Sequence, residues 1–395
     1  MNDVYQTLDM MRTLQSRLSA SISKPARPWK GFFVDDRESK ERGILLYGAR
    51  GTGKTTYLLR VAQATGGIYL STDHPALSTR PLFEWVEALF QRGATHVYLD
   101  EIHHAVEWSR SLKMLYDSYP NCFIRASGSS SLLLSSDIGD LSRRFIGVHL
   151  PYLSFREYLV LNGLPDYGTI NPFGDPHDVL DTILQTHNVL SLFESYLSTG
   201  MRPIFMEGDE HYSTNVIQVA QKTIEADIPY IIPHLGTNHF RLMNAILGYL
   251  SQSDIPVMQV NSLCREWNIG KEKLYSLVHA MEQSGLVRII RRKSDHTAMS
   301  VGTKIFLADP TLYSALSGRE GNTREAFAAC AFQSSGMTVN AASNEHEADF
   351  LIDNDFTVEV GGRKKNPKRA DFVIRDGADW PAPGIIPLWT LGFMW

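Results

Sequence analysis

A glycine-rich stretch, GARGTGKTT, runs from Gly48 to Thr56 and has the residue types needed to hold a phosphate. It follows the spacing G-x-x-x-x-G-K-T, in which glycines let backbone N–H groups turn inward toward phosphate oxygens. The lysine supplies a positive charge for the outer phosphates, and the hydroxyl after it suits Mg²⁺. The sequence therefore predicts a nucleotide-phosphate site rather than a simple turn.

The flanking residues predict the strand and the helix that such a loop requires, because ILLY precedes it and YLLRVAQ follows it. The positive N-terminal end of that helix adds to the attraction for phosphate. We expect Lys54 to be partly exposed at the junction of loop and helix, and Thr55 to be a magnesium ligand. The residues expected to line the site are Gly48, Ala49, Arg50, Gly51, Thr52, Gly53, Lys54, Thr55 and Thr56.

A second stretch, HVYLDEIHH, supplies two adjacent carboxylates at the end of an apolar strand. Asp100 is placed to hold Mg²⁺, and Glu101 is placed to polarise an attacking water. Because the pair lies downstream of a phosphate-binding loop, we interpret it as machinery for hydrolysis rather than as ordinary loop acids. His103 and His104 resemble metal ligands, but adjacent residues on a helix point about 100° apart. We therefore interpret them as packed or solvated histidines.

Alternating strand and helix patterns from Gly43 to about Leu150 predict the scaffold for both sites. Short apolar strands between helices indicate a parallel sheet with helices on both faces. The carboxyl ends of such strands share one edge, where the loop and the acid pair would meet. The predicted strands are 43–47, 66–72, 96–100 and 122–128, and the predicted helices are 54–65, 81–93 and 108–119.

The composition of the 395-residue chain is that of a multidomain globular protein, with 43% hydrophobic and 21% charged residues. A net charge of −5 gives no overall attraction to nucleic acid or membrane, so any such contact must be local. Three scattered cysteines argue against a disulfide framework, and no apolar run reaches membrane-spanning length. We expect a cytoplasmic protein with no membrane partner that begins with an amphipathic helix.

The sequence changes character after residue 150. Helical patterns in 151–237 predict a lid or an adaptor. In 238–309, three helices and two strands have the layout of a winged helix-turn-helix, whose third helix enters a DNA major groove. A local basic face would meet double-stranded DNA, or the module would serve packing and protein contacts. The basic residues are Lys271, Lys273, Arg288, Arg291, Arg292 and Lys293.

The last segment, 310–395, contains three carboxylates with the pattern of a metal site. Asp349 and Glu359 lie on two consecutive predicted strands, and Glu325 lies on the helix before them. Three such carboxylates can bind Mg²⁺ in a nuclease-type site, or they can be acids on solvated faces. If they gather, they repel one another and need a nearby cation or proton.

The chain resembles bacterial and archaeal AAA+-type ATPases that combine a P-loop core, a winged helix and a C-terminal PD-(D/E)xK-like domain. The resemblance rests on GARGTGKTT, YLDEIHH, ASGSSSLLL, RRFIGVHLPYLSFREYL, YLSTGMRPIF, and EADF followed by VEVGG. It implies ATP and Mg²⁺ as cofactors. It also implies an α/β fold: a P-loop NTPase core with an N-terminal helix (1–150), a helical lid (151–237), a winged helix-turn-helix (238–309) and a restriction-nuclease-like domain (310–395).

The resemblance also implies further catalytic residues. Ser127 or Ser129 would be the polar sensor that contacts the terminal phosphate or the attacking water. Arg143 or Arg144 would be an arginine finger, often supplied by a neighbouring subunit, which makes a homo-oligomer an expected partner. A surface salt bridge is an equally good interpretation of these arginines. Arg202 is a weaker candidate, as a lid sensor.

One departure from the family pattern concerns the nuclease-like domain. A working site needs a lysine two residues after the glutamate, and Gly361 stands at that position. Without a cation there, nothing obvious neutralises the transition state, although Lys364 or Lys365 could reach in. We therefore expect a degenerate site. Three hypotheses follow: an ATPase, an ATP-regulated metal-dependent nuclease, and a nucleotide-dependent regulator that binds DNA or protein.

Overall fold

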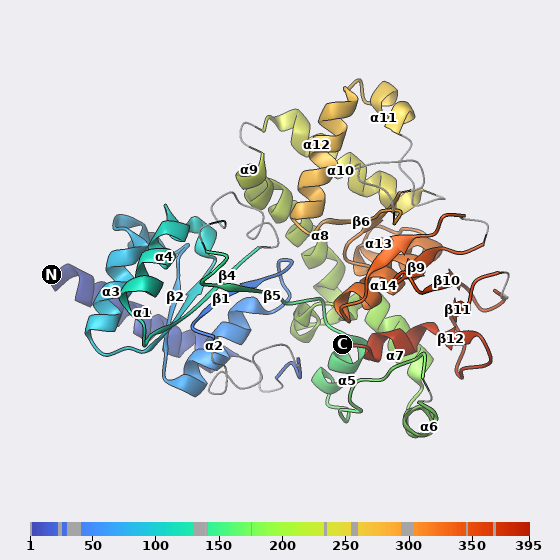
Figure 1. Cartoon of the computed structure of the whole chain (residues 1–395), viewed down its shortest axis with the longest axis horizontal. Coiled ribbons are helices and arrows are strands. Elements are labelled where there is room, and N and C mark those ends of the chain that lie inside the picture. The colour runs from blue at the N-terminus through green and yellow to red at the C-terminus, as the bar shows by residue number, and fades with distance from the viewer. Residues whose placement is uncertain are drawn as a thin grey trace. The chain divides into compact units, whose positions relative to one another are not determined.

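The protein is described by a computed structural model and divides into two compact units, Met1–Pro151 and Tyr152–Trp395. Figure 1 shows the elements of both units. The structure describes residues 2–22, 26–29, 41–129, 139, 141–174, 176–232, 235–253, 260–293, 303–344, 347–365 and 369–395. Among these residues, no helix combines the length and apolar character needed to cross a membrane.

The first unit is built on a five-stranded parallel sheet in the order β2-β3-β4-β1-β5. Because all strands are parallel, their carboxyl ends lie along one edge, which confirms the predicted parallel α/β scaffold. Each predicted strand range agrees with the structure to within two residues, and β5 is an addition to the prediction. The strands are β1 (Gly43–Tyr47), β2 (Ile68–Ser71), β3 (His96–Asp100), β4 (Phe123–Gly128) and β5 (Ile146–His149).

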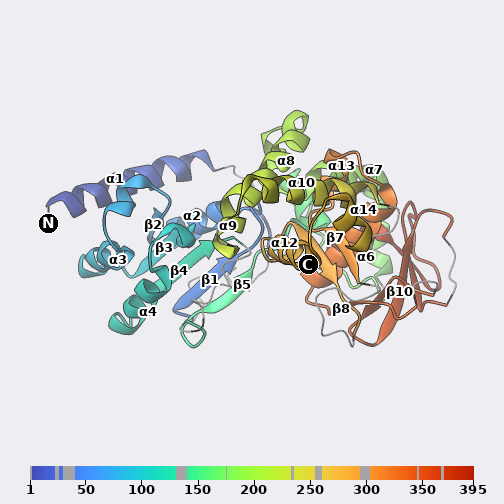
Figure 2. The ribbon, with the colours of Figure 1, turned by 90° about the horizontal axis from the view of Figure 1, so that it is seen from above.

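Helices cover both faces of this sheet (Figure 2). One core cluster contains Trp85 and Leu112, from the helices α3 and α4, and a second cluster contains Leu58 from α2. The N-terminal helix contributes Leu8 to the first cluster and Leu18 to the second, so it spans the edge between them. The helices are α1 (Asn2–Ser21), α2 (Lys54–Thr65), α3 (Leu82–Gln91) and α4 (Trp108–Ser118).

The helix α1 also closes the exposed edge of β2. The side-chain amide of Gln15 donates to the carbonyl of Gly67 at 3.0 Å, and its oxygen accepts from the backbone N–H of Tyr69 at 3.0 Å. One glutamine thus makes the two hydrogen bonds that a neighbouring strand would make. Unpaired strand edges invite pairing with other chains, so this contact protects the sheet.

The second unit begins with helices and ends in a mixed sheet. A helical region precedes three helices and the antiparallel pair β6–β7, and the turn predicted between those strands lies outside the described residues. The bounds are α5 (Phe155–Leu161), α6 (His177–Thr186), α7 (Val189–Ser195), α8 (Tyr212–Lys222), α9 (Ile228–Ile231), α10 (Thr237–Gln252), α11 (Val260–Glu266), α12 (Lys271–Gln283), β6 (Val287–Ile290) and β7 (Lys304–Leu307).

The C-terminal sheet has the order β12-β11-β10-β9-β8. Strand β9 pairs antiparallel with both β8 and β10, and β10, β11 and β12 pair in parallel. A bridge between Arg292 and Ala341 connects the end of β6 to β8. The bounds are α13 (Thr311–Ala315), α14 (Glu320–Ser334), β8 (Val339–Ala341), β9 (Phe350–Ile352), β10 (Phe356–Gly361), β11 (Phe372–Arg375) and β12 (Ile385–Pro387).

An aromatic core joins the helical region of this unit to its C-terminal segment. The ring of Phe155 lies 5.2 Å from that of Phe193 and 5.6 Å from that of Phe393, in edge-to-face contacts. Phe193 in turn lies 5.2 Å from Phe327 on α14. Residues predicted to form a lid and a separate C-terminal domain therefore share one core, and the boundaries proposed between them stay a prediction.

A buried ion pair anchors the same unit. Arg202 Nε lies 2.5 Å from Asp309 Oδ2, and both side chains are at most 5% exposed. The other oxygen of Asp309 accepts from the N–H and the hydroxyl of Thr311. The guanidinium also lies over the ring of Tyr152. These contacts hold Arg202 within the second unit, and the lid-sensor role considered from the sequence stays a prediction.

We predict that Arg202→Met destabilises the protein by about 3–5 kcal/mol, because it leaves Asp309 as an uncompensated buried charge. The matched control is Arg369→Met, which breaks the 2.6 Å pair with Glu347 at a side chain that is 77% exposed. That change should cost at most about 1 kcal/mol. Urea denaturation of both variants is the measurement, and equal effects would contradict the assignment.

Candidate functional site

The phosphate-binding loop follows β1 and ends where α2 begins. Gly51 and Gly53 have φ values of 75° and 97°, in the left-handed region that favours glycine. The helix starts at Lys54, as predicted. Thr52 is fully buried, and its hydroxyl donates to the carbonyl of Ala49 at 3.0 Å. The loop is therefore a fixed turn with the backbone reversals that a phosphate cradle needs.

Gly48 has a different reason to be glycine. A Cβ there would collide with the backbone carbonyl oxygen of Leu150, the residue after the last strand of the unit. The N–H of Leu150 donates to the carbonyl of Tyr47 at 2.7 Å, which fixes this close approach. The first position of the loop is thus packed directly against the end of the first unit.

Lys54 is buried, with 6% of its surface exposed, so the expectation of a partly exposed side chain is wrong. Its Nζ donates to the carbonyls of Gly48 and Ala49 at 2.8 and 2.9 Å. The ammonium is held inside the loop because these two carbonyls accept hydrogen bonds from it. Of the other predicted residues, Arg50 is partly buried, whereas Thr55 and Thr56 have largely exposed surfaces at the start of α2.

Asp100 is the centre of a hydrogen-bond network at the carboxyl edge of the sheet. Its Oδ2 accepts from the hydroxyl of Thr55 at 2.6 Å and from that of Tyr69 at 2.8 Å. Its Oδ1 accepts from the hydroxyl of Ser127 and from the N–H of Glu101. Burial, and then the Asp100 charge, raises the pKa of Tyr69, which keeps this phenol a neutral donor. The two predicted magnesium ligands, Thr55 and Asp100, are thus in contact.

Glu101 follows the last residue of β3 in the left-handed conformation, with φ 50°. Non-glycine residues in that region are uncommon and cluster at functional sites. The hydroxyl of Thr72 donates to the Glu101 carbonyl at 2.7 Å. The turn after the strand is therefore anchored on the neighbouring chain segment.

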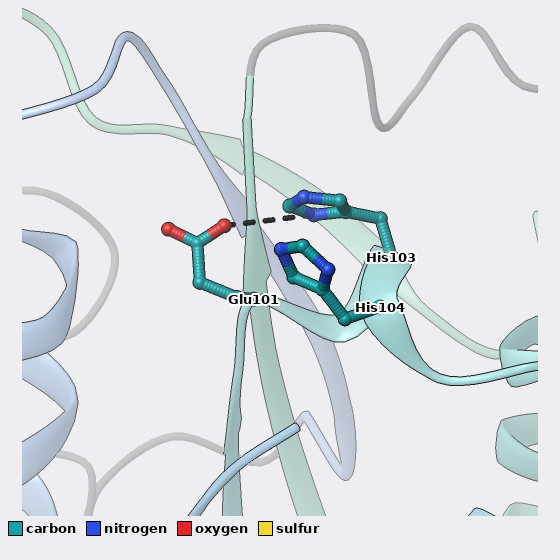
Figure 3. Close-up of side chains that lie close together, drawn as sticks. All are labelled: Glu101, His103 and His104. Carbon is teal, nitrogen blue, oxygen red and sulfur yellow. Dashed lines mark ion pairs between the residues drawn. The ribbon is translucent and has the colours of Figure 1, made fainter. Parts of the chain in front are cut away.

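The two histidines after Glu101 lie side by side, contrary to our interpretation from helix geometry. Residues Ile102–His104 form a single 3₁₀ turn, and the ring centroids of His103 and His104 are 4.4 Å apart. One ligand atom from each of Glu101, His103 and His104 lies within 4.8 Å of the other two. Figure 3 shows the carboxylate facing the imidazoles. The helical periodicity used for the prediction does not apply to so tight a turn.

The two sensor candidates lie on or just after β4, which pairs with both β1 and β3. Ser127 is fully buried at the end of that strand, and its hydroxyl binds Asp100. Ser129 follows the strand and is 4% exposed. The Ser127 hydroxyl therefore donates a hydrogen bond to the Asp100 carboxylate in this structure. The sensor role of either serine stays a prediction.

The arginine candidates lie at the opposite edge of the sheet. Arg143 and Arg144 precede β5, which runs parallel to β1, so they lie at the amino edge and the loop at the carboxyl edge. Arg144 makes two hydrogen bonds, of 2.8 and 2.9 Å, with Asp117, and this contact lowers the pKa of Asp117. Arg143 is exposed. Neither arginine lies at the phosphate-binding edge of its own chain.

In the second unit, the three C-terminal carboxylates are paired with lysines. Lys304 Nζ lies 2.8 Å from Glu325 Oε2 and 2.7 Å from Asp349 Oδ1, and its side chain is 5% exposed. Lys365 Nζ lies 2.6 Å from Glu359 Oε1. Burial raises the pKa of Glu325, whereas Lys304 opposes that rise. An ammonium from β7 thus lies between two of the acids, where a metal ion would have to bind.

The position of the missing catalytic lysine is filled from farther along the chain. A Cβ at Gly361 would lie 2.6 Å from Cγ of Lys365, so that side chain passes over the glycine. Of the two lysines considered from the sequence as able to reach in, Lys365 is the one that lies at this place. Whether the three carboxylates form a degenerate nuclease site stays a prediction.

The predicted basic face is partly used for internal contacts. Arg291 makes two hydrogen bonds with Glu282, and Arg288 donates to Gln333 on α14. The Arg291 carbonyl accepts from the N–H of Ala341 at 2.9 Å, which ties the end of β6 to the C-terminal sheet. The exposed residues of the set are Lys271, Lys273 and Lys293.

Several residues near the loop were missed from the sequence. Arg27 donates to the carbonyl of Thr52 at 3.0 Å, and the Trp29 ring lies 5.6 Å from that of Tyr57. Tyr69 binds Asp100 from the edge strand. Arg27 and Trp29 lie in a segment without periodicity, so no local pattern could reveal them. Tyr69 is the second residue of β2, and its contact with Asp100 depends on the pairing of β2 with β3, which no local pattern reveals.

The residues at the carboxyl edge fit a nucleoside triphosphate with Mg²⁺. The Thr55 and Asp100 oxygens lie 2.6 Å apart. This is close to the spacing of about 2.9 Å expected for adjacent oxygens at about 2.0–2.1 Å from an octahedral ion. The loop glycines, Lys54 and the start of α2 provide donors for phosphate. The chemistry of the donor set therefore suits these two groups together.

One segment of the chain is similar to a known protein family. Residues 40–159 match a family model described as an AAA domain. The uncharacterized protein MJ1637 of Methanocaldococcus jannaschii is 36% identical over 136 residues, which are 31% of this chain and 28% of that protein. The uncharacterized protein MJ1544 of the same organism is 23% identical over 280 residues, 67% of this chain and 60% of that protein. The matches span less than two thirds of either relative.

Solved structures overlap with the chain only loosely. The RuvB Holliday junction branch migration motor of Thermotoga maritima has a TM-score of 0.33 at 15% identity, covering 74% of this chain and 90% of its own. The Orc1 protein of Aeropyrum pernix in complex with DNA has a TM-score of 0.30 at 15% identity, covering 78% and 91%. Scores this low support no conclusion about function. The family match is confined to residues 40–159, less than half of the chain, and this segment is similar to an AAA domain.

Proposed function

We propose that the chain is an AAA+-type ATPase that binds and hydrolyses ATP with Mg²⁺. The observation that carries the proposal is the shared edge: α2 begins with Lys54 and Thr55 after the loop that follows β1, and the Thr55 hydroxyl donates to Asp100 at the end of β3, directly before Glu101. A phosphate cradle, a magnesium-binding oxygen pair and a carboxylate able to accept a proton are thereby assembled within one unit. The AAA domain match agrees with this arrangement.

Each residue has a defined role in the proposed reaction. The turn at Gly51 and Gly53 presents N–H groups to the phosphates, and Lys54 leaves its carbonyl partners to pair with them. Thr55 and Asp100 hold Mg²⁺, which neutralises charge on the phosphates when bound. Glu101 orients the attacking water and accepts its proton. Because the Asp100 network fixes the edge, these groups need little rearrangement.

We further propose that hydrolysis moves the second unit. Gly48 is packed against Leu150, and the chain passes from the first unit to the second at Pro151. A shift of the loop on nucleotide binding or release would therefore displace Leu150, the residue before Pro151. Because Gly48 packs against Leu150, which is bonded directly to Pro151, this contact favours mechanical coupling over a purely diffusional signal.

The first prediction for this function separates binding from chemistry. Glu101→Gln keeps the shape and hydrogen bonding of the side chain but removes the base, so turnover should fall by about 10²-fold or more. ATP affinity should remain. Lys54→Ala is the comparison, and it should lose ATP binding itself. Single-turnover ATPase assays with a fluorescent-nucleotide binding assay test both, and loss of binding in Glu101→Gln would assign that residue a structural role.

We also propose that the ATPase is a homo-oligomer in which an arginine acts on the next subunit. Arg143 and Arg144 lie at the edge of the sheet opposite the loop, so either could act only on another copy. Arg143 is the better candidate, because Arg144 is already held by Asp117. An arginine finger is worth about 10³–10⁵-fold in rate.

A mixing experiment tests this proposal. Arg143→Ala should reduce turnover by at least about 10²-fold, and Arg144→Ala, the matched control, should reduce it less. Arg143→Ala mixed with Lys54→Ala should regain activity, because a mixed interface pairs an intact loop with an intact arginine. Turnover per protomer should also rise with protein concentration. A concentration-independent rate with no recovery on mixing would reject action across subunits.

Two alternatives concern the second unit. A nucleotide-dependent regulator would bind double-stranded DNA or protein through the proposed winged helix, and the exposed Lys271 and Lys273 on α12 favour this for DNA. The internal pairing of Arg288 and Arg291 favours packing instead. An ATP-regulated nuclease is favoured by Lys365 at Glu359 and disfavoured by Lys304 between Glu325 and Asp349.

For the C-terminal carboxylates, we predict no DNA cleavage by the wild type in Mg²⁺ or Mn²⁺, because Lys304 competes with a metal for Asp349. Linear, supercoiled and branched DNA are the substrates, with Asp349→Ala as the control. Lys304→Met should lower Tm, and addition of Mn²⁺ should raise the Tm of this variant more than that of the wild type. Cleavage by the wild type that disappears in Asp349→Ala would establish the nuclease alternative.

A further inference from the structure

The turn after β3 brings together three groups that the proposed ATPase cycle does not use together. Glu101, His103 and His104 each offer one ligand atom, and these atoms lie within 4.8 Å of one another (Figure 3). Within this group, His103 Nδ1 lies 3.6 Å from Glu101 Oε2. A carboxylate and two imidazoles are the donor set that first-row divalent metals such as Zn²⁺ prefer.

The backbone that carries these groups is held in place. Ile102, between the glutamate and the histidines, is fully buried. The Glu101 carbonyl accepts from the N–H of His104 at 3.0 Å and from the hydroxyl of Thr72 at 2.7 Å. These contacts fix the turn that aligns the side chains, so little order would have to be gained on binding a metal.

We propose that Glu101, His103 and His104 form a second metal site, selective for Zn²⁺, Co²⁺ or Ni²⁺ over Mg²⁺. Two atoms at about 2.0–2.1 Å from a tetrahedral ion are about 3.3–3.4 Å apart, so the 3.6 Å pair needs only a small adjustment. His104 is exposed and can complete the set by a modest rotation. Two nitrogen donors disfavour Mg²⁺, which takes oxygen ligands and keeps its waters.

The site has a consequence that rests on the proposed ATPase function. A metal ion held by the Glu101 carboxylate would prevent it from accepting a proton from water. The loop residues and Lys54 lie outside the metal site, so nucleotide binding would continue. Zn²⁺ would therefore act as a reversible brake on hydrolysis that leaves the nucleotide bound.

A Co²⁺ titration tests the site without any ATPase assay. The wild-type chain should bind one equivalent of Co²⁺ with visible absorption bands of low-symmetry, nitrogen-containing coordination. His104→Gln should weaken this binding by at least about tenfold, since even loss of an outer-shell partner typically costs 10–100-fold. The matched control is His149→Gln, which removes an exposed histidine of the same unit and should bind Co²⁺ as the wild type does. Equal affinity of all three proteins, or no binding by the wild type, would overturn the proposal.

A second measurement addresses the brake. Micromolar Zn²⁺ should lower the ATPase rate of the wild type in excess Mg²⁺, a chelator should restore it, and fluorescent-nucleotide binding should persist. His104→Gln should require at least about tenfold more Zn²⁺ for the same fractional inhibition. If Co²⁺ binds as expected while no ATPase activity exists, the metal site stands and the proposed function fails. Inhibition that is equal in both proteins would contradict the brake.

Discussion

The hydrogen bonds on the Asp100 carboxylate are the constraint on which the nucleotide site depends. Its donors are the hydroxyl groups of Thr55 at the start of α2, Tyr69 on β2 and Ser127 on β4. The backbone N–H of the next residue, Glu101, is the fourth donor. One buried acid thus ties three strands and a helix to a common point. A charged acceptor makes stronger hydrogen bonds than a neutral one, so this network fixes the relative positions of the loop and the proposed base.

Much of the first unit could be predicted from the sequence, because its signals are local. The loop spacing, the strand ends at Tyr47 and Asp100, and the helix start at Lys54 follow from neighbouring residues. The burial of Lys54 could not be foreseen, since it depends on carbonyls that only the folded loop presents. The pairing of His103 with its neighbour depends on a turn type that periodicity does not reveal.

The second unit was harder to predict because its key contacts join distant segments. The sequence predicts a cluster of Glu325 and Asp349 but not the residue that neutralises them. Lys304 precedes its partners by 21 and 45 residues and comes from a different element. The side chain of Lys365 passes over Gly361, so it brings an ammonium to a place where the family motif would have a lysine at position 361 itself. Such pairings follow from the topology, which short-range spacing does not encode.

The contact of Gln15 with β2 limits how copies of this protein can associate. An edge strand with unpaired backbone N–H and C=O groups can pair with a strand of another chain. Here the Gly67 carbonyl and the Tyr69 N–H already bind the side chain of Gln15. Association at that edge must therefore use side chains, which can separate without unfolding the sheet. Displacing α1 would leave the Gly67 carbonyl and the Tyr69 N–H of this edge without their partner Gln15, and unpaired strand edges invite pairing with other chains.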